Sequence, residues 1–182
     1  MNVVIDMRKS DRKDLIEGCI TVFMRELKLE KSKSTLIVFS RKDFENETGA
    51  AGMVYPYSDG LITMELDSRL GMDKLIHTIA HEMGHLALKH KFGKNVSVQT
   101  ARQYELQADV YGAKLAYKCG YDPKQAFAEM TAAEKRARTQ STATHPDYQT
   151  RKTHVQQQTG IPVAAINTLQ HNKMAIRNFM MA

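Results

Sequence analysis

The chain lacks the features that place a protein in a membrane or in a disulfide-stapled fold. None of its apolar runs reaches roughly 18 residues, so the sequence predicts no transmembrane helix. The first residues do not combine a basic segment with a long apolar one, so we expect no secretory signal and a cytoplasmic location. Two cysteines, Cys19 and Cys119, are too few for a disulfide framework and are expected to be small buried apolar residues.

The composition also lacks a strong bias. Charged residues make up 25% and hydrophobic residues 42%, which is ordinary for a globular chain long enough to bury its own core. The net charge of +6 is dispersed in small clusters, without interleaved aromatic residues or a nucleic-acid motif, so we expect no nucleic-acid partner. The chain contains no internal repeat. We expect one domain over residues 1–160 and a C-terminal helical tail over 161–182.

Hydrophobic periodicity predicts an α+β fold, in which a small mixed sheet lies beside a mainly helical part. Helical spacing of apolar residues covers 10–29, 72–90, 98–118, 122–138, 146–159 and 163–181. Strand-like runs cover 34–40, 53–57 and 61–66. The last two runs flank the turn residues Ser58-Asp59-Gly60 and are expected to form a hairpin. Pro56 favours an edge or a bulge for the first of them.

Residues 81–85 read His-Glu-Met-Gly-His, two histidines four apart with a glutamate directly after the first. On an α-helix these histidines lie one turn apart on the same face, where both imidazoles can bind one Zn²⁺. Glu82 is rotated by about 100° from His81, beside the metal, where a general base for water belongs. The alternative is a chance match in which His81 and His85 form an ordinary hydrogen-bonded pair. The surrounding apolar spacing predicts a half-buried helix, and Gly84 predicts the close approach of another backbone or a ligand.

A catalytic zinc site needs a third protein ligand, and Glu105 is the candidate. It lies 20 residues after His85, which leaves room for a loop and an antiparallel helix. Asp109 is one turn further along the same face and could accept the N–H of a ligating histidine. The alternative for both residues is a solvated acidic face, and His90 is expected to be a capping or surface group. Small residues on this face would let two helices approach closely; they are Ala101, Gly112 and Ala113.

Four segments together resemble the CAAX prenyl endopeptidase and HtpX-like zinc metallopeptidases, especially their soluble relatives such as the minigluzincins. They are HEMGH, ELQAD at 105–109, GYDP at 120–123, and THP at 144–146 followed by an arginine at 151. The resemblance implies a zincin-like gluzincin domain that holds one zinc ion per chain through His81, His85 and Glu105. It implies Glu82 as the general base and Asp109 as the group that orients a histidine ligand. It also implies that His145 and Arg151 lie near the metal, on a loop closing over the site.

The predicted reaction is zinc-dependent hydrolysis of peptide bonds in a polypeptide substrate. Glu82 would take a proton from the attacking water and pass it to the leaving amine, while zinc, His145, Arg151 or a backbone N–H shares the oxyanion charge. The substrate is expected to lie extended along strand 61–66, taken as a sheet edge. Alternatively, His145 or the tail, through His171, could occupy the open metal position and suppress activity.

Two other functions share the same metal chemistry. A non-enzymatic, zinc-dependent binding or regulatory module could keep a metallopeptidase-like fold without needing Glu82. The regulator-cleaving H-E-x-x-H proteins of phage and bacteria usually act with DNA-binding partners, and the ELQAD and THP segments fit them less well. A Glu82→Gln change separates a binder from a peptidase, because only the peptidase needs the base.

Overall fold

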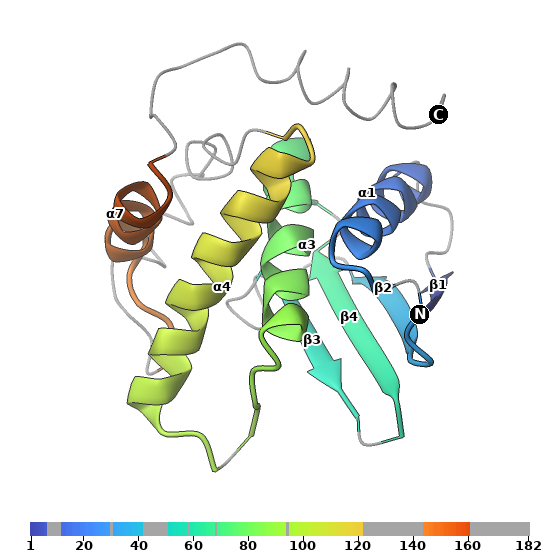
Figure 1. Cartoon of the computed structure of the whole chain (residues 1–182), viewed down its shortest axis with the longest axis horizontal. Coiled ribbons are helices and arrows are strands. Elements are labelled where there is room, and N and C mark those ends of the chain that lie inside the picture. The colour runs from blue at the N-terminus through green and yellow to red at the C-terminus, as the bar shows by residue number, and fades with distance from the viewer. Residues whose placement is uncertain are drawn as a thin grey trace.

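The computed structural model describes residues 1–6, 12–29, 31–41, 51–57, 59–67, 69–93, 95–121 and 144–160. Within these residues the fold is α+β, as predicted, with one small sheet and four helices (Figure 1). The strands are β1 Asn2–Asp6, β2 Thr35–Arg41, β3 Gly52–Pro56 and β4 Leu61–Asp67, and the helices are α1 Lys13–Glu26, α3 Met72–Ala87, α4 Val98–Lys118 and α7 Tyr148–Thr159. The expected helices over 122–138 and 163–181, and with them the tail that includes His171, lie outside the described residues.

The sheet is mixed and has the strand order β1-β2-β4-β3. β1, β2 and β4 run parallel, and β3 pairs antiparallel with β4, which confirms the predicted hairpin. The prediction that residues 61–66 form a sheet edge is wrong. β4 lies between β3 and β2, with Met64 paired to Val54 on one side and to Val38 on the other.

β3 is one of the two edge strands of the described sheet, in agreement with its proline. The ladder with β4 uses the carbonyl of Ala51, which accepts from Asp67, and the N–H of Tyr57, which donates to Leu61. Backbone polar groups alternate in direction along a strand, so those of Val54 and Pro56 point away from β4. Pro56 therefore removes no hydrogen bond from the ladder.

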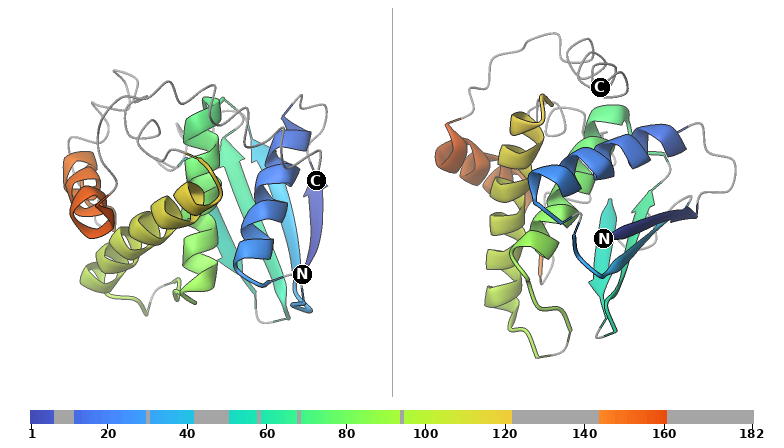
Figure 2. Two further views of the ribbon diagram at one scale, coloured as in Figure 1. Left: turned by 45° about the horizontal axis from the view of Figure 1, so that its top comes forward. Right: turned by 45° about the vertical axis from the view of Figure 1, so that its right-hand side comes forward.

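The helices cover one face of the sheet in successive layers. α1 and α3 lie over the sheet, α4 packs against α3, and α7 packs against the outer side of α4 (Figures 1 and 2). Alternate residues of the central strands point under the helices and are buried, among them Leu36, Val38, Ile62, Met64 and Leu66. No helix within the described ranges has the length and apolar composition needed to cross a bilayer.

α3 is buried far more completely than the half-buried helix that its sequence predicts, because α4 covers the side turned away from the sheet. Glycines allow this contact. A Cβ atom on Gly112 of α4 would lie 2.8 Å from the backbone nitrogen of His81, and one on Gly84 of α3 would lie 3.1 Å from the carbonyl oxygen of Ala108. The close approach predicted from Gly84 and Gly112 is thus confirmed, and it brings the polar faces of the two helices together.

Candidate metal centre

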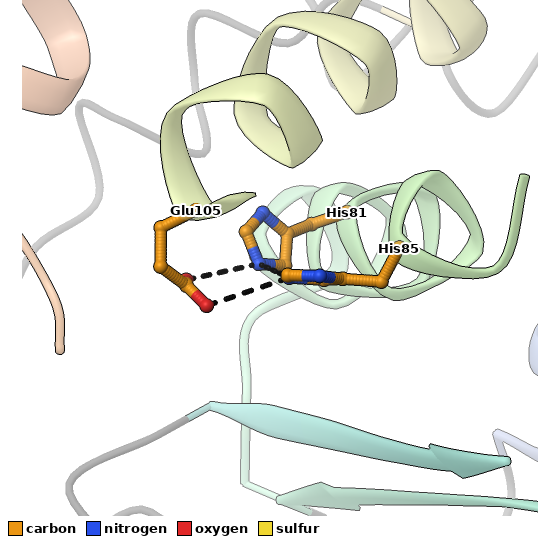
Figure 3. Close-up of side chains that lie close together, drawn as sticks. All are labelled: His81, His85 and Glu105. Carbon is orange, nitrogen blue, oxygen red and sulfur yellow. Dashed lines mark hydrogen bonds and ion pairs between the residues drawn. The ribbon is translucent and has the colours of Figure 1, made fainter. Parts of the chain in front are cut away.

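His81, His85 and Glu105 converge on one point between α3 and α4 (Figure 3). The two histidines lie one turn apart on α3, as their spacing predicts, and Glu105 reaches them from the first half of α4. Nε2 of His81 is 3.1 Å from Nε2 of His85. The carboxylate oxygens of Glu105 lie 3.4 Å from Nε2 of His81 and 3.5 Å from Nε2 of His85. Glu105 is therefore close enough to both histidines to be the third ligand.

These distances match the edges of a tetrahedral zinc site. Bonds of about 2.0–2.1 Å at tetrahedral angles separate two ligand atoms by about 3.3–3.4 Å. The three measured separations lie on either side of that value, and two imidazole nitrogens with one carboxylate form a donor set that zinc accepts. The residues therefore fit a zinc ion held by three protein ligands with a fourth position open.

The electrostatics of the three groups also favour a cation between them. Burial opposes a charge on His81, but hydrogen bonds with Asp109 and Glu105 outweigh it and raise the pKa of His81 to about 10. Burial, followed by the charge of His81, lowers the pKa of His85 to about 3. Burial opposes the charge of Glu105, yet its bond with His81 lowers the pKa of that carboxyl to about 2.

Asp109 lies behind His81 and is fully buried. Its Oδ1 is 2.9 Å from Nδ1 of His81, on the side of the ring opposite Glu105. Burial alone would disfavour this carboxylate, but the Arg151 guanidinium and the His81 ring hold its pKa well below the usual range. An ionised Asp109 accepts the Nδ1 proton of His81, so the orienting role predicted for Asp109 agrees with this geometry.

Arg151 reaches this carboxylate from α7. Its Nε and Nη2 atoms lie 2.6 Å from Oδ2 and Oδ1 of Asp109, and Nη2 is 4.0 Å from Oε2 of Glu105. Asp147 caps the N-terminus of α7 by accepting from the backbone N–H of Thr150, and so fixes the turn that carries Arg151. Arg151 thus lies near the three converging side chains, as the resemblance implies, with two nitrogens directed at Asp109. Its expected place on a loop is wrong, because it lies within helix α7.

His145 lies at the outer side of the site. Its Nε2 is 3.4 Å from Oε2 of Glu105, while its Nδ1 is 2.9 Å from the hydroxyl of Thr144. Its side chain is 39% exposed, in contrast to the buried His81 and His85. The THP segment therefore brings a partly exposed histidine to Glu105, on the solvent side of the three converging side chains.

Glu82 points from α3 toward the edge strand. Burial raises the pKa of this carboxyl to about 7, with the charges of His81 and Glu105 acting in opposite directions. The backbone of Val54 in β3 contributes a hydrogen bond to Glu82. The carboxylate therefore lies between the histidine pair and the outward-facing backbone of β3.

His90 is the site residue that the sequence does not predict. Of the two expected places, the cap of the helix is confirmed, because the backbone N–H of His90 donates to the carbonyl of His85. The surface is wrong, because the side chain is buried and its Nδ1 lies 2.9 Å from Nδ1 of His85. Its Nε2 lies 3.0 Å from Oε1 of Gln107 on α4, and its ring stacks on Tyr104. The only signal in the sequence is a histidine five residues after His85, just past the end of the helix.

The fold and the site define an α+β domain with a candidate metal centre, and comparison with protein families supports a class for it. Residues 93–159 match the model of peptidase family M48. The match covers α4 and α7, with Glu105, Asp109, His145 and Arg151, and it begins after the HEMGH segment. It supports a metallopeptidase of this family. Comparisons with curated proteins and with solved structures found no match.

Proposed function

We propose that the chain is a zinc-dependent endopeptidase of the gluzincin type with a zincin-like fold. The observation that carries the proposal is the meeting of His81, His85 and Glu105 at tetrahedral spacing, beside a buried glutamate that faces a sheet edge. The match of residues 93–159 to peptidase family M48 supports the same reaction class from another part of the chain. The resemblance of the HEMGH and ELQAD segments to HtpX-like peptidases adds the finer assignment.

His81, His85 and Glu105 would hold the ion. Zinc, when bound, supplies Lewis acidity, which polarises a carbonyl group and makes a water molecule more acidic. Glu82 takes a proton from the attacking water and delivers it to the leaving amine. Burial keeps competing bulk water away from this carboxylate, and a pKa raised to about 7 suits a group that must both accept and release a proton.

β3 is the strand along which we place an extended substrate. The sequence predicts strand 61–66 for this role, but that strand lies inside the sheet and has no free edge. The polar groups of Val54 and Pro56 point away from β4, on the side where Glu82 lies, and a peptide can add to such an edge through backbone hydrogen bonds. Side-chain pockets would then alternate along the peptide.

His145 and Arg151 take different roles in this proposal. The partly exposed Nε2 of His145 lies on the outer side of Glu105, where it can donate to the oxyanion of a bound substrate. Arg151 acts as a positioning residue, because its Nε and Nη2 atoms are directed at Asp109. Asp109 in turn holds His81 with Nε2 toward the ion.

Glu82→Gln tests the proposal directly. We expect the wild-type chain to carry one zinc ion by elemental analysis and to cleave casein or a peptide library. Glu82→Gln should retain zinc and lose cleavage by about 10²- to 10⁴-fold, the usual contribution of a general base. Glu105→Ala should lose zinc as well as activity, because one of three ligands is gone.

Glu17→Gln is the matched control, since Glu17 is exposed on α1, away from the site, and should change neither zinc content nor cleavage. A wild-type protein that binds zinc but cleaves nothing, or a Glu82→Gln variant with full activity, would contradict the proposal. The first outcome would favour the zinc-dependent binding module.

A further inference from the structure

The end of α3 places His90 next to His85. The helix closes with two backbone hydrogen bonds, from the N–H of Lys89 to the carbonyl of Leu86 and from the N–H of His90 to the carbonyl of His85. This pair of bonds is the Schellman motif, in which the residue just past the end of the helix adopts the left-handed backbone conformation. Lys89 is that residue, with a φ of 55°. In this motif the residue after the left-handed one contacts the helix residue that accepts its N–H, so the ring of His90 meets the ring of His85.

Gln107 determines which atoms donate in the two hydrogen bonds that link His85, His90 and Gln107. The amide oxygen of Gln107 has only lone pairs, so Nε2 of His90 carries the proton in the 3.0 Å bond between them. A neutral imidazole has a single N–H, so Nδ1 of His90 accepts. The 2.9 Å contact then requires Nδ1 of His85 to donate, and Nε2 of His85 keeps its lone pair.

Nε2 of His85 is the atom that faces His81 and Glu105. The tautomer set by His90 is therefore the one that a metal ligand needs. Each histidine of the pair has its own acceptor behind it: the carboxylate of Asp109 for His81 and the ring nitrogen of His90 for His85. Stacking on Tyr104 holds the plane of the His90 ring, with 4.2 Å between the ring centres.

We infer that His90 is a positioning residue for His85, and that Gln107 completes a relay which fixes the tautomers of both rings and thereby strengthens metal binding. The inference rests on the proposed metal site, but part of its test does not. The tautomers exist in the metal-free protein and can be measured whether or not the chain is a peptidase.

Long-range ¹⁵N–¹H NMR of the histidine rings in the metal-free protein at pH 7.5 is the first test. We expect His85 with its proton on Nδ1 and His90 with its proton on Nε2, with the signals of His90 assigned through their loss in a His90→Asn variant. The opposite arrangement, with Nε2 of His85 protonated, would overturn the inference.

Zinc affinity, measured by competition with a chromophoric chelator, is the second test. His90→Phe keeps a ring that can stack on Tyr104 but offers no acceptor, and we expect a fall of about 10- to 100-fold. His90→Asn puts a carbonyl oxygen where Nδ1 was, so it should retain most of the wild-type affinity. Equal zinc affinities for wild type and His90→Phe, both folded by circular dichroism, would overturn the inference. A wild type that binds no zinc would instead contradict the proposed function. The NMR result alone would then decide whether His90 sets the tautomer of His85.

Discussion

The guanidinium of Arg151 donates hydrogen bonds of 2.6 Å to both carboxylate oxygens of Asp109. This bond joins α7 to α4 at a carboxylate with no solvent exposure. Breaking a buried ion pair from one side is strongly destabilising, because the remaining charge loses its partner where solvent does not reach it. We expect Arg151→Met to lower the free energy of unfolding by about 3 kcal/mol in urea denaturation.

An ion pair at the surface provides the control for this change. Lys118 pairs with Glu26 but is 68% exposed, so Lys118→Met should leave the free energy of unfolding nearly unchanged. Equal effects of the two substitutions would show that the Arg151–Asp109 pair contributes no more than a surface pair.

Gly112→Ala tests the contact between α3 and α4. The added methyl group would meet three backbone atoms of Ala80 and His81 at 2.8–2.9 Å, and backbone cannot move aside as a flexible side chain can. We expect a loss of about 1–3 kcal/mol in the free energy of unfolding, and weaker zinc binding because His81 and Asp109 are pushed apart.

Gly18→Ala is the matched substitution. A Cβ atom on Gly18, in the middle of α1, meets nothing within 4 Å, so alanine should stabilise the helix by about 0.5–1 kcal/mol. If Gly112→Ala were also stabilising, α3 and α4 would not approach as closely as the structure indicates.

Local sequence patterns predict most of the helices and strands. The predictions that are wrong or missing, for β1 and His90, concern residues whose structure depends on partners far away in the chain. α4 spans Val98–Lys118, the bounds expected from its apolar spacing. β1 was missed because its five residues are identified as a strand only by pairing with β2, some 33 positions along the chain. The burial of His90 depends on a lysine in the left-handed conformation at 89, a place where sequence rules expect glycine or asparagine.

Cys19 gives a prediction of pH dependence away from the metal centre. It lies 3.7 Å from the hydroxyl of Tyr121, and burial raises the pKa of its thiol from the ordinary value of 9.0 to about 12. Between these values the unfolded chain loses the thiol proton and the folded chain keeps it, so stability falls as pH rises. We expect a loss of roughly 2 kcal/mol between pH 9 and 10.5 that Cys19→Ala lacks. Parallel pH profiles of wild type and variant in urea denaturation would contradict this assignment.

His145→Ala distinguishes the two roles considered for this histidine. If its Nε2 donates to the oxyanion, the variant should lose about 10²- to 10³-fold in kcat, while zinc affinity stays within the error of the measurement. This is the expected result, because the side chain is partly exposed and contacts Glu105 from the outer side of the site. A histidine that occupies the open metal position would give the reverse: higher kcat and weaker zinc binding in His145→Ala. Steady-state kinetics on a peptide substrate, with zinc affinity measured in the same buffer, separates the two, since only a fourth ligand couples a gain in rate to a loss of metal.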